Sequence, residues 1–515
     1  MVYKLFKNQH MLKFARLGLT KIMLPQIQER PDNHLIDLWA NEVGNVAKGA
    51  AFLHNMNYVD QEQEINPYFH DFSWLRDFFK IGGNSSKKQS LHLTRQWLQK
   101  YPKYHPKIWK KDLLCQRIIN WLIYFDLIWD HNDSLYQRKL FSCFNEHVYY
   151  IFRQQKEGFG DVANFLTLEA LIAVSCCFQS YEKYLRKFLL LLQEEIEQQI
   201  YQDGSHYSRN PLYQYQILRI LLEIRAFLYA VDRDIPSFLS DTIQHMVEIL
   251  TLLRHADGRL CIFHGSHEGD QAHINQVIRQ VHCQSRSPNT LTEMGLLRAQ
   301  RKQMLLFVDC ADSEFSEEES NYISPLSFEL SIGRTRVITN CGAPVVYDPV
   351  WQEALHSSAA HSTVTIGNVS PKIPYNIKYH QEEKDGFFLF DATHDGYKSA
   401  FQIYHRRVLC MDPKGTTLMG EDYLENIQDH DFDIRFHLHP LIRCSKLPKR
   451  NQVLLLFPDG SGWRFMTSFP QISLQESVYF GHDGKRKRTE QIVISGNKND
   501  LNYERCIKWT LKNIM

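Results

Sequence analysis

Residues 203–226 read DGSHYSRNPLYQYQILRILLEIRA, and this stretch joins a polar loop to an amphipathic segment. Asp203 and Gly204 predict a turn, and Pro211 suits the first turn of a helix that follows it. Apolar residues then recur at three- and four-residue spacing, at Leu212, Tyr215, Leu218 and Leu222. That spacing is typical of one face of a helix, so the loop presents its polar side chains at the positive end of a helix.

The same periodicity marks most of the first three hundred residues as helical. Residues 181–200 and 243–250 repeat the pattern, and short breaks at 202–205, 234–236 and 257–258 separate the segments. Successive helices with short connections predict antiparallel pairs. Such pairs can close into a bundle, a solenoid or a toroid, and periodicity alone leaves the three open.

The period changes to two after about residue 304. In residues 326–332, leucine, phenylalanine and isoleucine alternate with serine and glutamate, and residues 434–438 alternate in the same way. Further short strands are predicted at 304–309, 335–339, 362–367, 387–391, 452–457, 463–467 and 491–495. Many short, half-buried strands predict an antiparallel sandwich, and the acidic, serine-rich residues 312–320 predict a solvated linker before it.

Length, charge and composition narrow the class of protein. A chain of 515 residues exceeds one usual hydrophobic core, so two or three domains are expected. A net charge of +1, from 59 Lys+Arg and 58 Asp+Glu, gives no support to a nucleic-acid-binding protein. The sequence contains no run of 18 apolar residues, so it predicts no transmembrane span. The absence of a signal-peptide pattern predicts the cytoplasm, with the periplasm or cell envelope as the alternative.

Two loops carry side chains suited to chemistry. The first bears His206 and Arg209, followed by Tyr213 and Gln214 in the first helical turn. An Asx turn with an aromatic core contact is the structural alternative for this loop. The second loop, in residues 356–361, bears His356 and His361 among small residues that leave an imidazole accessible. A structural hydrogen-bond donor at the entrance of the strand that follows is the alternative for His361.

A third group of histidines lies among the predicted strands. It comprises His394 with Tyr397, then His405, then His437 and His439 on one strand. The spacing of the last two suits metal ligands, but no third ligand accompanies them. The sequence therefore assigns no metal site and leaves open a divalent metal such as zinc in the β-domain.

Several stretches together resemble the heparinase II/III-like family. Residues 203–226 resemble its DG…SP-x-Y-H run with the helix that follows, and residues 351–369, WQEALHSSAAHSTVTIGNV, resemble its AHNTV motif. Residues 327–342, 394–397, 405–408 and 434–440 are also similar to family stretches. The resemblance implies a multidomain α+β protein: an N-terminal extension (1–30), an incomplete (α/α) toroid (31–311) and a C-terminal antiparallel β-sandwich (321–515).

The family implies cleavage of acidic polysaccharides at uronic acid residues by β-elimination. A cation or hydrogen-bond donor neutralises the C5 carboxylate, a base removes the C5 proton, and an acid protonates the departing O4. The resemblance assigns catalytic roles to Tyr213 and His361, with Tyr397 as a second tyrosine. It assigns substrate binding to Asn164, His206, Arg209, Gln214, His356 and His405.

Two departures from the family pattern bear on activity. Active relatives open a toroid helix with an Asn-His pair, whereas the corresponding stretch here is Ala163-Asn164-Phe165-Leu166, and the asparagine of the AHNT motif is Ser362. A glycan-binding or scaffold protein that keeps the fold without turnover is therefore the alternative. A hydrolase on the same toroid is a third reading, but it requires two carboxylates flanking the bond.

Overall fold

The computed structural model describes residues 24–31, 44–54, 66–154, 162–281, 290–291, 293–312, 322, 324–345, 348–373, 375–425, 427, 430–470, 472–496 and 506–514. Most of the predicted N-terminal extension and of the predicted linker lies outside these ranges. The chain forms two compact units. Unit 1 comprises Met1–Gln199 and Gln216–Ile243, and unit 2 comprises Ile200–Tyr215 and Gln244–Met515.

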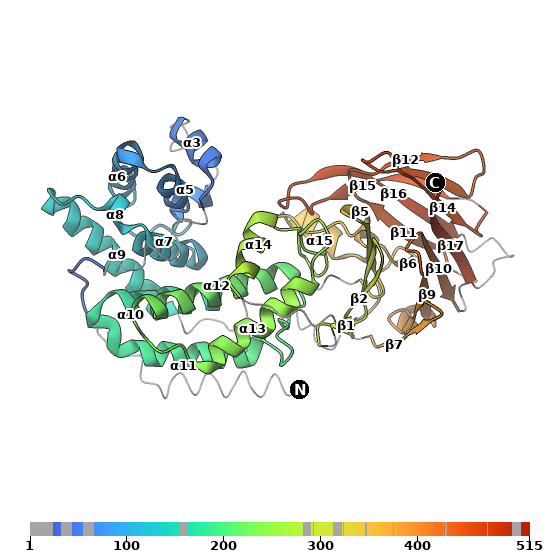
Figure 1. The fold of residues 1–515 in the computed structure, drawn as a ribbon, viewed down its shortest axis with the longest axis horizontal. Helices are drawn as coiled ribbons and strands as arrows, with labels where there is room; N and C mark the ends of the chain where they lie inside the picture. The colour runs from blue at the N-terminus through green and yellow to red at the C-terminus, as the bar shows by residue number, and fades with distance from the viewer. Residues whose placement is uncertain are drawn as a thin grey trace. The chain divides into compact units, whose positions relative to one another are not determined.

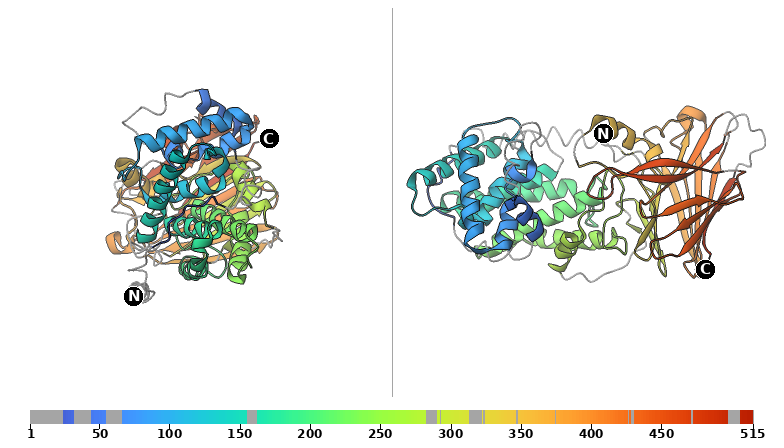
Figure 2. Two further views of the ribbon diagram at one scale, coloured as in Figure 1. Left: turned by 90° about the vertical axis from the view of Figure 1, so that its left-hand side faces the viewer. Right: turned by 90° about the horizontal axis from the view of Figure 1, so that it is seen from above.

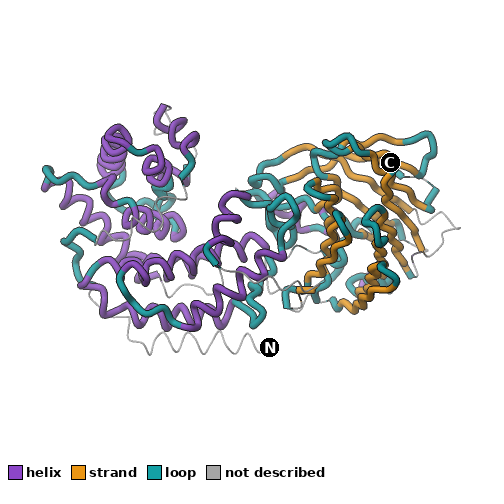
Figure 3. The backbone as a smooth tube through the Cα atoms, in the orientation of Figure 1, coloured by secondary structure: helices purple, strands orange, loops and turns teal. Residues whose placement is uncertain are grey.

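Unit 1 is helical, as Figures 1 and 3 show. Its described helices are α3 (Val46–His54), α4 (Pro67–His70), α5 (Trp74–Ile81), α6 (Gly83–Lys100), α7 (Lys111–Ile123), α8 (Phe125–Ile128), α9 (Ser134–Gln154), α10 (Val162–Cys177), η4 (Gln179–Tyr181) and α11 (Glu182–Gln199), with most of α12 (Pro211–Ala230) and the first part of α13 (Ser237–Leu252). The apolar face predicted for residues 181–200 is confirmed, because its members in α11 are buried. Helix α10 is buried on nearly all sides, as its apolar composition requires.

Unit 2 contains two antiparallel sheets, whose strands run from yellow to red in Figure 2. Its helical elements are α14 (Gln271–Arg279), α15 (Pro349–His356), η6 (Ser358–Ala360) and α16 (Lys398–Phe401). Its strands are β1 (Thr290–Leu291), β2 (Leu296–Arg301), β3 (Met304–Asp309), β4 (Phe328–Ile332), β5 (Thr335–Thr339), β6 (Val364–Ile366), β7 (Ile377–Lys384), β8 (Phe387–His394), β9 (His405–Met411), β10 (Thr417–Leu424), β11 (Phe432–Leu438), β12 (Arg443–Lys446), β13 (Gln452–Leu456), β14 (Gly462–Thr467), β15 (Ser473–Tyr479), β16 (Lys487–Gly496) and β17 (Cys506–Asn513).

One sheet has nine strands in the order β1-β2-β3-β4-β5-β11-β16-β15, with β6 pairing β11. The other has eight strands in the order β12-β13-β14-β17-β10-β9-β8-β7. A hydrophobic core formed by residues of both sheets includes Phe328, Phe436 and Trp509, whose rings pack with centroids 4.9–6.1 Å apart. The predicted order of a helical region before an antiparallel β-sandwich is confirmed.

Strand β4 differs from the half-buried strand that its alternation predicts. Its polar face is buried as well, because residues of the segment 254–262 pack on it. His255 contacts both Glu329 and Ser331, and the backbone N–H of Ile262 donates to Glu329 at 3.0 Å. The segment after α13 therefore belongs structurally with the sandwich.

The boundary between the units also differs from the predicted domain boundary near residue 311. Strands β1, β2 and β3 precede that point and pair with β4 in the nine-stranded sheet, and residues 200–215 group with unit 2 as well. Among the described residues, no single helix is long and apolar enough to span a membrane. One pair of helices, Val162–Cys177 with Gln179–Gln199, passes the same test of length and composition but is bent by 120°.

Candidate active site

The loop before α12 fixes the first part of the candidate site, all of which lies in unit 2. Asn210 caps the helix, because its Oδ1 accepts hydrogen bonds from the backbone N–H groups of Leu212 (2.8 Å) and Tyr213 (3.3 Å). The Nδ2 of the same side chain donates to the backbone oxygen of His264 at 2.9 Å. One asparagine therefore ties the half-buried Tyr213 to the loop that carries His264.

A buried carboxylate lies at the end of β3. Asp309 is 1% exposed, and its oxygens lie 3.8 Å from Nη1 of Arg209 and 3.5 Å from Nε2 of His264. The hydroxyl of Ser324 donates to it at 3.2 Å. Burial alone raises the pKa of Asp309, but His264 and Arg209 outweigh burial and hold the pKa below its usual value. Asp309 is therefore an ionised anchor for both side chains.

Arg209 and His264 share an uncommon backbone conformation. Their φ angles are 57° and 50°, in the left-handed region that residues other than glycine rarely occupy. Such strain persists where the surrounding structure holds it, and it concentrates at functional sites. The Nη1 of Arg209 is buried and has no hydrogen-bond partner among the described residues, although the side chain is 7% exposed. Its Nη1 therefore faces the carboxylate of Asp309 at 3.8 Å without a hydrogen bond.

His361 follows the short helix η6 and is 3% exposed. Its Nε2 lies 3.2 Å from the backbone oxygen of Leu355, so Nε2 carries the ring hydrogen and Nδ1 carries a lone pair. That Nδ1 is buried without a hydrogen-bond partner in the described part of the chain. Burial lowers the pKa of His361 to about 4, with His264 also lowering it. At neutral pH this imidazole can accept a proton but supplies no positive charge.

The ring of Tyr322 packs beside the rings of His356 and His361. Its ring centroid lies 4.5 Å from that of His356 and 6.2 Å from that of His361. Burial raises the pKa of Tyr322 to about 12, and the nearby Tyr213 adds to this shift. Gly265 leaves room for the phenol, because a Cβ there would lie 2.3 Å from Cε2 of Tyr322. The structure thus brings together Arg209, Tyr213, His356 and His361 of the predicted residues, and adds Tyr322, His264 and Asp309.

Gln214 and His206 lie beside this site but face the protein. Gln214 is fully buried; its Oε1 accepts from the N–H of His206 (2.9 Å), and its Nε2 donates to the oxygens of Gly204 (2.8 Å) and Met246 (3.2 Å). His206 is 1% exposed, its Nδ1 contacts Ser208 at 2.7 Å, and burial lowers its pKa to about 3. The geometry does not support the predicted substrate contacts of these two residues, because both hold the loop in place.

Replacing Gln214 with Leu should therefore destabilise the protein. The substitution leaves three buried backbone groups without their partner, so we expect a loss of about 3 kcal/mol of unfolding free energy. Equilibrium denaturation of the variant and of Gln475→Leu, the same change at an exposed site in β15, measures the difference. Equal midpoints for the two variants would contradict the anchoring role.

Three further predicted residues lie elsewhere. Tyr397 is 1% exposed in the core of the sandwich, where its hydroxyl donates to the oxygen of Val364 at 2.9 Å. His405 is fully buried between His394 (3.1 Å) and Asp422 (2.8 Å). The geometry supports substrate contact for neither, because no side-chain surface remains. Asn164 belongs to unit 1, where it accepts from Lys111 and donates to Glu195, both at 3.1 Å.

The histidines of the β-domain do not fit a metal ion. Both ring nitrogens of His437 face protein atoms, Oγ of Ser477 at 2.8 Å and the oxygen of Ala359 at 3.0 Å. His405 likewise has a protein partner on each nitrogen. Among the described residues, no group of three or more His, Cys, Asp or Glu side chains is arranged to hold a metal.

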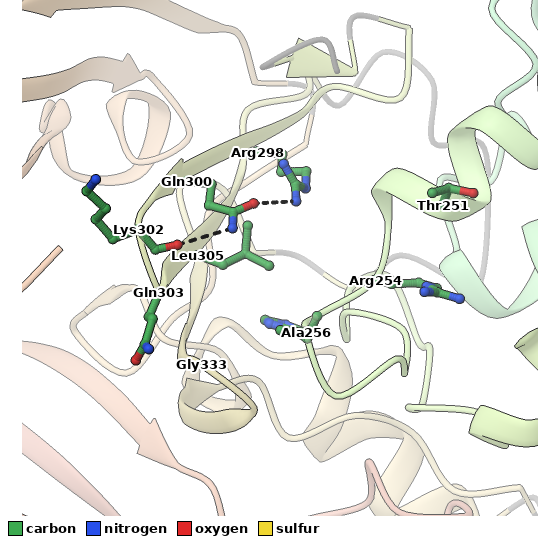
Figure 4. A pocket seen from close by; sticks show the side chains of 10 residues that line it. Thr251, Arg254, Ala256, Arg298, Gln300, Lys302, Gln303, Leu305 and Gly333 are labelled. Carbon is green, nitrogen blue, oxygen red and sulfur yellow. Dashed lines mark hydrogen bonds between the residues drawn. The ribbon is translucent and has the colours of Figure 1, made fainter. Parts of the chain in front are cut away.

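A cavity of about 400 Å³ lies beside the hairpin of β2 and β3. Its lining is Thr251, Arg254, His255, Ala256, Arg298, Gln300, Lys302, Gln303, Leu305 and Gly333. In Figure 4, Gln300 bridges Arg298 and Lys302, whereas Lys302 and Arg254 extend away from one another. The three cations do not converge, and no residue of the candidate site lines this cavity.

Comparison with known proteins places the chain in a family. The family model described as "Heparinase II/III N-terminus" matches residues 55–286. The model described as "Heparinase II/III-like, C-terminal" matches residues 284–510. FtsZ-localized protein C of Caulobacter vibrioides is 23% identical over 480 residues, which cover 86% of this chain and 81% of that protein.

Solved structures show the same fold. Heparinase III gives a TM-score of 0.72 at 16% identity, over 98% of this chain and 91% of that one. A mutant of the heparan sulfate lyase HepC from Pedobacter heparinus gives a TM-score of 0.63 at 15% identity, over 94% of this chain and 86% of that one. Such low identities show the fold alone. The chain has a polysaccharide lyase fold, a toroid-like helical region followed by a β-sandwich. Since the N-terminal and C-terminal models of the family together match residues 55 to 510, the chain belongs to the heparinase II/III-like family.

Proposed function

We propose that this protein cleaves glycans containing uronic acid by β-elimination. One observation carries the proposal: Tyr213 shares a site with two buried atoms that have no hydrogen-bond partner among the described residues, Nη1 of Arg209 and Nδ1 of His361. A buried donor or acceptor without a partner costs free energy, so its retention favours a ligand that completes it.

The roles follow from the chemistry of the three groups. Arg209 neutralises the C5 carboxylate, for which a guanidinium offers paired donors and a permanent charge. A neutral imidazole removes the C5 proton; the sequence predicted His361, and the site holds a second neutral histidine in His264. Tyr213 protonates O4 as the glycosidic bond breaks.

The substrate class follows from Arg209 and from the relatives. A buried arginine with an available donor selects a ligand with a carboxylate or sulfate group. The proteins of similar fold include a heparan sulfate lyase by name, and heparan sulfate is an acidic polysaccharide. Hydrolysis has less support, because the carboxylate of this site, Asp309, is already engaged by Arg209 and His264.

A protein without turnover is the second candidate. The family's Asn-His pair is incomplete here, and Ser362 in place of the motif asparagine is fully buried, with its hydroxyl donating to the oxygen of Thr339 at 2.7 Å. The curated relative is named for its localisation with FtsZ, not for a reaction. A scaffold that binds a glycan, or that localises with FtsZ as this relative does by name, accounts for both observations.

Incubation of the full chain with a panel of uronate glycans separates these functions. Elimination creates a C4=C5 double bond conjugated with the carboxylate, so we expect ultraviolet absorbance to grow together with new chain ends. Hydrolysis produces new ends without absorbance, and a binding protein produces neither while retaining affinity for a glycan. Either of the latter results would overturn the proposal.

A further inference from the structure

His264 has the geometry of a general base, although the sequence motifs did not single it out. Its side chain is 11% exposed, whereas His361 is 3% exposed, so His264 is the more accessible imidazole of the site. Asn210 fixes its backbone relative to Tyr213, and Gly265, the next residue, packs against Tyr322. The backbone of His264 is therefore held to the backbone of Tyr213 through Asn210, and the next residue lies against the ring of Tyr322.

The partner of His264 differs in kind from that of His361. Nε2 of His264 faces the carboxylate of Asp309 at 3.5 Å, and since a carboxylate only accepts, Nε2 carries the ring hydrogen. That leaves a lone pair on Nδ1, for which no hydrogen bond to a described residue is found. The corresponding partner of His361 is the neutral backbone oxygen of Leu355.

This difference decides which imidazole is the stronger base. A base that takes a proton becomes an imidazolium, and a buried carboxylate stabilises that cation more than a carbonyl oxygen does. The groups that face His264 are Asp309, which favours its charged form, and Arg209 and burial, which oppose it and lower the pKa of His264. His361 also faces it as a neutral ring. His264 is thus neutral and ready to accept a proton.

We propose that His264, oriented by Asp309, removes the C5 proton in the elimination reaction, and that Asp309 is a positioning residue for both this base and Arg209. This inference rests on the proposed function. Nδ1 of His264 takes the C5 proton, the electron pair of the C5–H bond forms the C4=C5 double bond, and the C4–O4 bond breaks. O4 takes the proton of Tyr213, and exchange with solvent then restores both side chains.

Replacing His264 with Gly tests the assignment. Glycine suits the left-handed backbone at this position, so we expect the variant to fold. Its kcat/KM should fall about 10²- to 10⁴-fold, the usual contribution of a general base. Added imidazole should restore part of the activity, and the restored rate should rise with the free-base fraction of imidazole. A structural histidine would give no such rescue.

Two further variants make the test specific. His361→Gln keeps a donor for Leu355, and added imidazole should not restore the activity that this variant loses. Asp309→Asn should lower the rate and move the acidic limb of the kcat/KM profile to lower pH, because the carboxylate that favours the imidazolium is gone. Wild-type activity in His264→Gly, or a loss that imidazole restores in His361→Gly instead, would overturn the inference while leaving the lyase function intact. A wild-type protein without elimination activity would overturn both.

Discussion

Replacing Tyr213 with Phe should remove nearly all elimination activity while leaving the fold and the affinity for glycan in place. The substitution deletes one hydroxyl from a half-buried ring at the start of α12, and the backbone of that turn stays capped by Asn210. Without the phenol, O4 leaves as an unprotonated alkoxide. We expect kcat to fall about 10²- to 10⁴-fold, the range for loss of a general acid, with little change in KM.

Tyr229→Phe is the matched control for this variant. Tyr229 lies on the same helix and is 65% exposed, so its hydroxyl should be dispensable. The initial rate of ultraviolet absorbance compares the two variants with the wild type. Full activity in Tyr213→Phe together with loss in Tyr322→Phe would transfer the role of acid to Tyr322, the other phenol near His361.

The periodicities of the sequence predicted the two halves of the fold because each reports a local geometry. The pattern in 181–200 marks a helix observed at Glu182–Gln199, and the alternation in 434–438 marks a strand observed at Phe432–Leu438. The boundary between the two units differs from the predicted domain boundary because of tertiary contacts. Strands β2 and β3 lie before the acidic segment, yet they pair with each other and, through β4, with the sheet that follows it.

Burial of polar residues could not be predicted from the sequence. Gln214 follows Tyr213 in the motif, but its three partners lie at residues 204, 206 and 246, which only folding brings together. Tyr397 and His405 also depend on distant strands for their contacts. A motif gives the residue type, whereas the direction of a side chain depends on its tertiary neighbours.

The residues missed by sequence reasoning are those without a motif. His264 lies in a loop that periodicity does not describe, and its positive φ is visible only in the structure. Asp309 ends a predicted strand, a position that suits either a solvated cap or a buried acid. Tyr322 adjoins a segment predicted to be a solvated linker, and its contacts with His356 and His361 are tertiary.

Replacing Asp422 with Asn should cause a large loss of stability. This fully buried carboxylate on β10 accepts hydrogen bonds from His405 and Arg407, both at 2.8 Å, and from the indole of Trp509 at 2.9 Å. Arg407 is also fully buried, and it holds the backbone oxygens of Leu326 and Ser362. Asparagine keeps the shape but leaves the guanidinium without a counter-charge, which costs about 3–5 kcal/mol in unfolding free energy.

The neighbouring ion pair between Asp391 and Arg406 provides the control. It has two hydrogen bonds, of 2.6 and 2.7 Å, but its side chains are 30% and 46% exposed, so Asp391→Asn should cost no more than about 1 kcal/mol.

The pH dependence of the stability lost in Asp422→Asn gives a second check. Burial raises the pKa of Asp422, but Arg407 and His405 outweigh it and hold the pKa well below its usual range. The stabilisation is therefore complete above the unfolded pKa of about 3.9 and is lost as the pH falls towards the lower folded value. Denaturant titrations should show a constant gap between wild type and Asp422→Asn from neutral pH to about pH 4 and a narrowing gap in stronger acid; a gap that stays constant in acid would mean that the lost stability came from packing and not from charge.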